Sequence, residues 1–215
     1  MRFFIITTMS KSIVLVDGQN FLKISNSIIE KSGPKKVRKP LVSLKLKELV
    51  IKTLRQHPEI SQSEIYFYSA KLKIHPETEE KSKELITEQR KLKNDLEKQG
   101  VKFLISGNVR PQEERNSKGK VTGIKFKEKG VDVKVAVDMV AMACDKRYET
   151  IVLCSSDSDL QPAVAEAQRR GIKVIYLGFK TNPNKGLIYT TDKAYLFTNE
   201  DIINAFGYSP ASRQK

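Results

Sequence analysis

Five aspartates, in three separate stretches of the chain, are the residues best suited to chemistry. Asp17 and Asp157 each follow a short apolar run. The others are Asp159, two residues after Asp157, and the pair Asp132 and Asp138 in a longer apolar stretch. Carboxylates that lie close together repel one another, so they must be protonated, paired with a cation or bridged by a metal ion. A group of carboxylates without His or Cys would form a hard oxygen site suited to Mg²⁺ or Mn²⁺.

The elements expected around these aspartates bring three of them to one place. The apolar runs at 13–16 and 151–154 predict buried strands that end directly before Asp17 and before the polar string containing Asp157. Residues 131–144 predict a buried helix that opens with Asp132 and leads into the second of these strands. The alternating valines in this stretch make a strand the alternative interpretation. A crossover helix runs antiparallel to the strand that follows it, so all three carboxylates are expected at the carboxyl edge of the sheet, where such sheets place their functional crevice.

Each of these residues also has a purely structural interpretation. An aspartate after a strand commonly caps the next helix, and this applies to Asp157 or Asp159 and to Asp132. Asn20 either caps the first helix or orients a bound group from its first turn. Asp138 lies ~9 Å along the helix axis and ~120° around it from Asp132, so from a straight helix it does not readily bind the same ion. The geometry leaves three interpretations open for Asp138: a position just outside the metal ligands, a position at a second metal ion, and a hydrogen bond to a neighbouring strand.

The remaining periodicity predicts a single α/β domain over residues 12–208. Strands alternate with helices, which indicates a mostly parallel sheet of five to six strands with helices on both faces. Residues 107–130 are expected to form a basic β-ribbon or flap, residues 1–11 an N-terminal extension, and residues 209–215 a flexible tail. The other expected strands are 64–69, 101–105, 172–177 and 195–197, and the other expected helices begin at Phe21 and cover 41–55, 77–99, 160–170 and 200–206.

The charge of the chain points to a polyanionic partner. Its 39 Lys and Arg outnumber 25 Asp and Glu, for a net charge of +14. Residues 31–55 carry a net charge of +8 and residues 110–129 carry +4, so the excess is concentrated in two stretches. Concentrated basic charge favours nucleic acid as the partner. The lysines and arginine expected to hold the nucleic-acid backbone are Lys35, Lys36, Arg38, Lys39, Lys118, Lys120, Lys125, Lys127 and Lys129.

Composition excludes several classes of protein. No apolar run reaches the ~18 residues of a membrane span. The two cysteines, Cys144 and Cys154, form no disulfide framework, which predicts a cytoplasmic protein, and both are expected to be small core residues. A homodimer remains compatible with the sequence.

Three motifs in order resemble the NYN domain, a PIN-like ribonuclease fold, and are most similar to its LabA-like branch. They are residues 16–20 (VDGQN), residues 129–133 (KGVDV) with Asp138 further on, and residues 155–160 (SSDSDL). Ser156 and Leu160 depart from the residues common in the family, and neither departure removes a carboxylate. The resemblance covers roughly residues 12–198. It implies a PIN-like fold and metal-dependent endonucleolytic cleavage of RNA, with Asp17, Asp132 and Asp157 as the core metal-binding carboxylates and Asp138, Asp159 and Asn20 in support.

The expected function is therefore a Mg²⁺- or Mn²⁺-dependent endoribonuclease acting on single-stranded or structured RNA. A PIN-like module that binds RNA or a protein without cutting is the main alternative, because the fold alone does not fix activity. Two other metal-dependent phosphotransfer folds rank lower. A toprim domain requires a Glu where this chain has Asp17, and a haloacid dehalogenase phosphatase requires an Asp where it has Gln19.

Overall fold

The computed structural model describes residues 12–32, 44–57, 60, 63–117 and 119–208 of the chain. The expected extension (1–11) and tail (209–215) lie outside the described residues. Five of the basic residues predicted to bind nucleic acid also lie outside them: Lys35, Lys36, Arg38, Lys39 and Lys118.

A seven-stranded sheet in the order β4-β3-β2-β1-β5-β6-β7 forms the centre of the molecule. All neighbouring strands are parallel except β3 and β4. The α/β class and the mostly parallel sheet are thus confirmed, but the prediction of five to six strands was too low because the ribbon adds its own strand to the sheet. The strands are β1 (Ser12–Asp17), β2 (Glu64–Lys71), β3 (Lys102–Arg115), β4 (Val121–Lys129), β5 (Thr150–Cys154), β6 (Lys173–Phe179) and β7 (Lys193–Phe197).

The helices connect these strands in the alternating pattern that the sequence predicts. They are α1 (Gly18–Ser32), α2 (Leu46–Thr53), α3 (Glu79–Lys98), α4 (Val131–Cys144), α5 (Gln161–Arg169), α6 (Lys185–Thr190) and α7 (Asn199–Ala205), with 3-10 turns η2 (Pro76–Thr78) and η3 (Ser158–Leu160). Residues 41–43 of the predicted helix 41–55 lie outside the described residues, and within the described part α2 covers only Leu46–Thr53. Helix α5 is preceded by η3. Helix α6 was not predicted at all. None of the described helices is long and apolar enough to cross a membrane.

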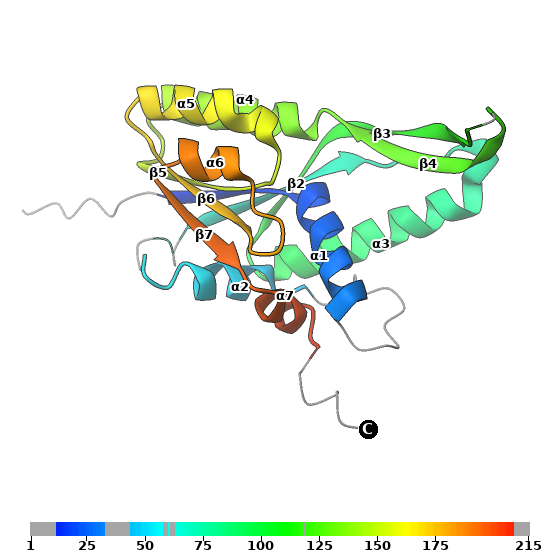
Figure 1. Cartoon of the computed structure of the whole chain (residues 1–215), viewed down its shortest axis with the longest axis horizontal. Helices are drawn as coiled ribbons and strands as arrows, with labels where there is room; N and C mark the ends of the chain where they lie inside the picture. The colour runs from blue at the N-terminus through cyan, green and yellow to red at the C-terminus, as the bar shows by residue number, and fades with distance from the viewer. Residues whose placement is uncertain (1–11, 33–43, 58–59, 61–62, 118, 209–215) are drawn as a thin grey trace, which may run out of the picture.

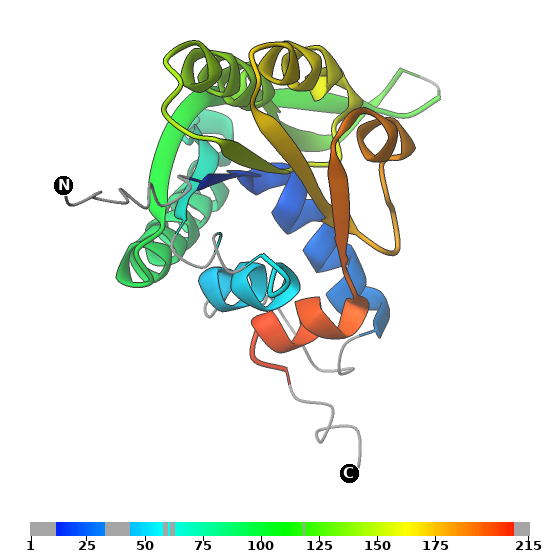
Figure 2. The same ribbon diagram turned by 90° about the vertical axis from the view of Figure 1, so that its left-hand side faces the viewer.

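Helices cover both faces of the sheet (Figures 1 and 2). A hydrophobic layer lies on each face, and alternate side chains of β1 contribute to the two layers. Ile13 and Leu15 pack in the layer under α4 and α5, whereas Val14 and Val16 pack in the layer under α1, α2, α3 and α7. Successive side chains of a strand point to opposite faces, so a strand buried on both faces must be apolar throughout. Strand β1 meets this requirement from Ile13 to Val16.

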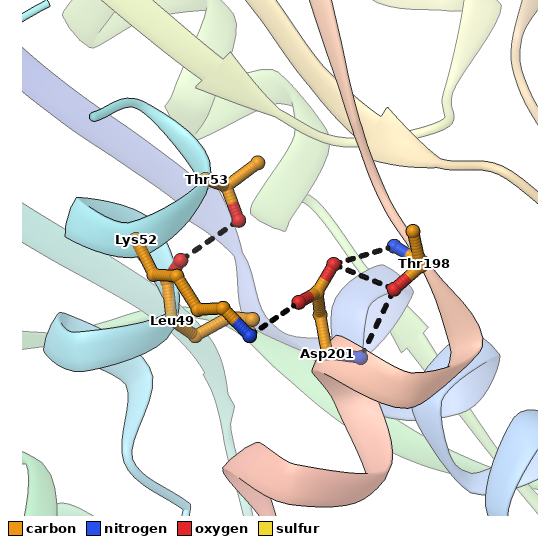
Figure 3. A network of polar contacts seen from close by, with 5 residues as sticks. All are labelled: Leu49, Lys52, Thr53, Thr198 and Asp201. Carbon is orange, nitrogen blue, oxygen red and sulfur yellow. Dashed lines mark hydrogen bonds and ion pairs between the residues drawn. The ribbon is translucent and has the colours of Figure 1, made fainter. Parts of the chain in front are cut away.

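Helices α2 and α7 are joined by a polar network on the second face (Figure 3). Thr198 and Asp201 form a capping box at the start of α7, and Lys52 Nζ donates to Asp201 Oδ1 at 2.9 Å. Burial acts to raise the pKa of Asp201, but hydrogen bonds from Thr198 and Lys52 outweigh it and leave this pKa below its usual value. The acid is therefore matched to donors that favour its charged form.

Strands β3 and β4 form the predicted ribbon, which extends from one edge of the sheet (Figure 1). Gly107 and Gly130 face each other at its base, and both have positive φ angles, +72° and +88°. A Cβ on Gly107 would lie 2.3 Å from the carbonyl oxygen of Lys129. Glycine is therefore required at position 107 by both backbone conformation and space.

Cys144 differs from its prediction. It is exposed at the end of α4, whereas Cys154 is buried in β5 as expected. The apolar content of α4 predicted a helix buried all round, but Val133 and Val137 on one face of the helix are 61% and 56% exposed. Only the face of α4 toward the sheet and α5 is covered, so Cys144 lies outside the core.

Candidate active site

Asp17 lies at the point where the order of the strands reverses. Strand β1 lies between β2 and β5, and after β1 the chain first builds the β2 side of the sheet and later returns to build the β5 side. The carboxyl ends of β1 and β5 are level, because Val16 pairs with Cys154 in the parallel register. Loops diverge at such a position and leave a crevice.

Gly18 explains how a helix can begin directly after Asp17. A Cβ at this position would lie 2.3 Å from the ring of Phe67 and 2.4 Å from the carbonyl oxygen of Tyr68, both in the neighbouring strand β2. No side chain fits there without moving backbone. The Asp-Gly pair therefore holds the Asp17 carboxylate at the edge of the sheet while α1 passes close to β2.

The carboxylate of Asp17 is buried, with only 6% of the residue exposed. Its Oδ1 accepts a hydrogen bond from the Asn20 backbone N–H at 3.0 Å, and its Oδ2 accepts one from the Ser155 hydroxyl at 3.3 Å. Burial raises the pKa of Asp17 and outweighs these two hydrogen bonds, and the nearby charges of Asp157 and Asp132 raise it further. No described Lys or Arg forms an ion pair with this acid.

The loop after β5 is organised by short polar contacts. Ser155 Oγ, besides donating to Asp17, accepts from the backbone N–H of Asp157 at 3.2 Å. Asp157 caps η3 by accepting from the Asp159 N–H at 3.0 Å, which is the capping role that the sequence allowed. Asn20 Oδ1 accepts from the Ser156 N–H at 3.0 Å and so joins α1 to this loop. The side chain of Asp159 is exposed and does not line the cavity beside Asp17.

A cavity of about 760 Å³ brings together aspartates from the three motifs. Asp17, Asp132 and Asp157 all line it, as does Asn20. Asp132 comes from the first turn of α4, which begins directly after Gly130 at the base of the ribbon. Helix α4 therefore presents its first turn to the same edge of the sheet as β1 and β5.

Three exposed lysines line the same cavity. Lys127 and Lys129 come from β4 and are among the lysines expected to bind nucleic acid, whereas Lys23 comes from α1 and was not singled out from the sequence. None of the three forms an ion pair with a described acid. A phosphate group entering the cavity would therefore meet free cations at its rim and carboxylates further in. Lys120 is exposed near the tip of the ribbon, away from the cavity lining, and the structure describes only the backbone of Lys125.

Asp138 is not part of the cavity lining. Its Oδ2 accepts from the Tyr68 hydroxyl at 3.0 Å, and its Oδ1 forms an ion pair with Lys134 one turn earlier in α4. Burial and the charge of Asp138 both raise the pKa of Tyr68, so the phenol remains a donor. These contacts satisfy Asp138 locally, in agreement with the helical geometry that separates it from Asp132.

Besides Lys23, two residues at this site were missed from the sequence. Glu128 on β4 lines the cavity, and burial, followed by the charges of Asp17 and Asp132, raises its pKa to about 8. Asn184 caps α6 and donates to the Ser156 carbonyl at 2.9 Å, so it supports the loop after β5. Asn184 could have been found from the sequence, because asparagine is a common N-cap residue of helices. Glu128 was counted only as one charge of a basic ribbon.

The acidic side chains that line the cavity offer only oxygen atoms as ligands, and oxygen is the ligand type that hard divalent cations prefer. One buried oxygen, Oε1 of Glu128, accepts no hydrogen bond within the described structure. The spacing is wider than in a closed site, because no three His, Cys, Asp or Glu side chains among the described residues are grouped tightly enough to hold a metal ion. Mutual repulsion between uncompensated carboxylates favours this separation.

Comparison with known proteins identifies the family. Residues 11–198 match the NYN domain. The chain is similar in fold to the crystal structure of a protein of unknown function, VPA0982 from Vibrio parahaemolyticus RIMD 2210633, with a TM-score of 0.53 and 18% identity over 87% of this chain and 93% of that one. No curated protein matches the chain. Since the NYN match covers most of the sequence and includes all three aspartate motifs, this chain belongs to the NYN domain family, a family of PIN-like nucleases.

Proposed function

We propose that this protein is a Mg²⁺- or Mn²⁺-dependent endoribonuclease that cleaves at the cavity between β1, β5 and α4. The observation that carries the proposal is that one cavity combines Asp17, Asp132 and Asp157 with three lysines at its rim. A divalent cation bound there would activate a water molecule and stabilise the charge that develops on the phosphate. The LabA-like resemblance of the motifs supports the same reaction.

We assign each residue near the cavity a role in binding the cation or in positioning the residues that bind it. Asp17, Asp132 and Asp157 would hold the cation, each from a different element, so their relative positions are set by the sheet. Asn20 and Ser155 position these acids, because Asn20 bonds both Asp17 and the loop after β5 while Ser155 bonds both Asp17 and Asp157. Asp159 supports Asp157 through its backbone N–H, and Asp138 supports α4 through Tyr68.

The lysines favour a nucleic-acid substrate held by its backbone. Lys23, Lys127 and Lys129 would bind phosphates, and Lys120 and Lys125 extend the basic charge along the ribbon. Contacts to phosphate carry little sequence information. We therefore propose that the enzyme selects RNA by shape and by unpaired regions, as proteins that bind RNA commonly do.

A module that binds RNA without cutting it is the second candidate. The observation in its favour is that the described carboxylates are not grouped tightly enough to hold a metal ion. The two candidates differ in what a divalent cation does: it is essential for turnover in the first and irrelevant in the second.

The test is incubation of the purified protein with single-stranded and hairpin RNA in Mn²⁺, in Mg²⁺ and in EDTA. Cleavage that requires the cation and is lost in the double variant Asp17→Asn, Asp157→Asn supports the nuclease. Binding without cleavage, unchanged by EDTA, selects the second candidate, and cleavage that survives the double substitution removes the mechanism.

A matched control is available in the same helix as Asp132. Asp145 is an exposed carboxylate at the C-cap of α4, thirteen residues and therefore ~20 Å from Asp132. The Asp145→Asn variant makes the same chemical change at the far end of α4 and should cleave like the wild type.

A further inference from the structure

Glu128 occupies an unusual environment for a surface ribbon. Along the end of β4 the exposed residues Lys127 and Lys129 alternate with the more buried Phe126 and Glu128. Opposite Glu128 in the antiparallel register lies Val109, which is only 7% exposed and belongs to the layer under α4. Directly paired residues share a face of the sheet, so the Glu128 side chain points toward that apolar layer and not toward solvent.

Among the residues that the structure describes, none is a hydrogen-bond or ion-pair partner of the Glu128 side chain. The buried Oε1 accepts no hydrogen bond from any described residue, and Glu128 forms no ion pair with a described Lys or Arg. Its electrostatic neighbours are Asp17 and Asp132, two further acids. A buried carboxylate without a partner lowers stability, and two nearby like charges lower it further.

We propose that Glu128 is a fourth carboxylate of the metal site, held by β4 so that its unpaired oxygen binds the same divalent cation as Asp17 and Asp132 once that cation offsets the repulsion that separates these side chains. The inference rests on the proposed function, because it assigns one more ligand to that cation. The ribbon would then supply a metal ligand as well as the lysines that bind phosphate. Glu128 would bind the cation inside the cavity, while the exposed Lys127 and Lys129 would meet phosphate at the rim of the same cavity.

The geometry at the base of the ribbon supports this assignment. Glu128 and Asp132 lie on either side of Gly130, whose close approach to Gly107 fixes the turn from β4 into α4. A strand end and a helix start are thereby joined by a short, conformationally constrained link. Side chains carried on such regular elements are held more accurately than side chains on loops.

The experiment is a Mn²⁺ titration followed by thermal unfolding of the full chain without RNA, in wild type, Glu128→Gln, Glu128→Asp, Asp17→Asn and Glu149→Gln. Glu149 is an exposed acid directly before β5, at the opposite edge of the sheet, and serves as the matched control. We expect Glu128→Gln to weaken the Mn²⁺ midpoint by at least the roughly 10–100-fold that loss of an outer partner costs a metal site. Glu128→Asp should retain part of the affinity, and Glu149→Gln all of it.

A second readout, in EDTA at neutral pH, separates this role from a structural one. Removing a buried, unpaired acid should leave the melting temperature of Glu128→Gln equal to or above that of the wild type, whereas loss of a structural contact would lower it. If Glu128→Gln retains wild-type Mn²⁺ affinity while Asp17→Asn loses it, the assignment of Glu128 is wrong and the proposed function stands. If the wild type itself shows no Mn²⁺ stabilisation, both are overturned.

Discussion

Asp17 is buried and Asp201 is partly buried, and the two acids differ in whether their surroundings stabilise the charged carboxylate. Asp201 lies between α7 and α2 with Lys52 and Thr198 around it, and its pKa is lowered despite burial (Figure 3). Asp17 lies at the end of β1 with two hydrogen bonds and no cation, and burial together with Asp157 and Asp132 raises its pKa. The first acid stabilises the fold at neutral pH, whereas the second costs stability there.

This difference separates the part of the molecule that holds the fold from the part suited to chemistry. Between α2 and α7, where the contact is purely structural, Asp201 is surrounded by hydrogen-bond donors. At the carboxyl edge of the sheet it gathers acids around a cavity instead. Groups kept in an unfavourable charge state are typical of functional sites.

The largest effect should follow from removing Asp17. We expect Asp17→Asn to reduce RNA cleavage by more than the roughly 10–100-fold that an outer-shell substitution costs. Asp201→Asn, the same substitution at the paired acid, should change cleavage less than threefold. Initial rates on one labelled RNA in Mn²⁺ measure both, and equal losses in the two variants would remove the distinction between the two regions.

The two aspartates of α4 should respond in opposite ways. Asp138→Ala leaves the fully buried Tyr68 hydroxyl without its acceptor, so it should lower the free energy of unfolding by about 1–3 kcal/mol and reduce cleavage less than tenfold. Asp132→Ala should abolish cleavage with little loss of stability. Urea unfolding and cleavage rates of both variants decide this, and an Asp138→Ala protein that is stable but inactive would move Asp138 into the active site.

A smaller effect with opposite signs is expected in the stability of the protein in EDTA. Because the pKa of Asp201 is lowered, its contribution is full above the unfolded value of 3.8 and is lost as the pH falls through the folded pKa. Asp201→Asn should therefore lose about 1 kcal/mol at pH 7, the typical value of a helix cap. Asp17 has the reverse linkage: its contribution is full below 3.8 and is lost as the pH rises through its raised pKa.

Asp17→Asn should thus melt above the wild type at pH 7, where Asp201→Asn melts below it. The difference for Asp17→Asn should shrink as the pH falls through the raised pKa of Asp17, whereas the difference for Asp201→Asn should persist at pH 4, because Asp201 loses its contribution only below 3.8. Melting temperatures across pH 4–8 measure this, and a lower melting temperature for Asp17→Asn at pH 7 would contradict the proposed contrast.

The smallest effect concerns the lysines at the rim. The double variant Lys127→Gln, Lys129→Gln should weaken RNA binding by several-fold and reduce the slope of log affinity against log salt by about 1.4, since each contact to single-stranded phosphate contributes roughly 0.7. Lys193→Gln, an exposed lysine at the start of β7, is the matched control. An unchanged salt slope in the double variant would show that the RNA lies elsewhere.

The location of the three aspartates at the carboxyl edge of the sheet was predictable from the positions of the buried parallel strands. The apolar runs before Asp17 and before the 155–159 loop mark strands that must be buried on both faces, and parallel strands end at one edge. Asp132 could be placed there because its helix leads into β5. The antiparallel ribbon was likewise visible as a polar, glycine-containing stretch.

What the sequence did not reveal depends on tertiary packing. The burial of Glu128 arises from Val109 across the ribbon, a pairing that only the register determines. The exposure of Cys144 depends on which face of an almost wholly apolar helix remains uncovered. Helix α6 is only 6 residues long, too short for a helical period to stand out.

Because Gly107 and Gly130 fix the base of the ribbon, the length of the ribbon can change without changing the geometry of the site. Because the two backbones nearly touch at that point, residues beyond it can be added or removed in register without shifting the start of α4. Related chains would then be free to vary how far this arm reaches along a bound polymer. Changes at its tip would alter which molecules the ribbon binds without moving the proposed cleavage site.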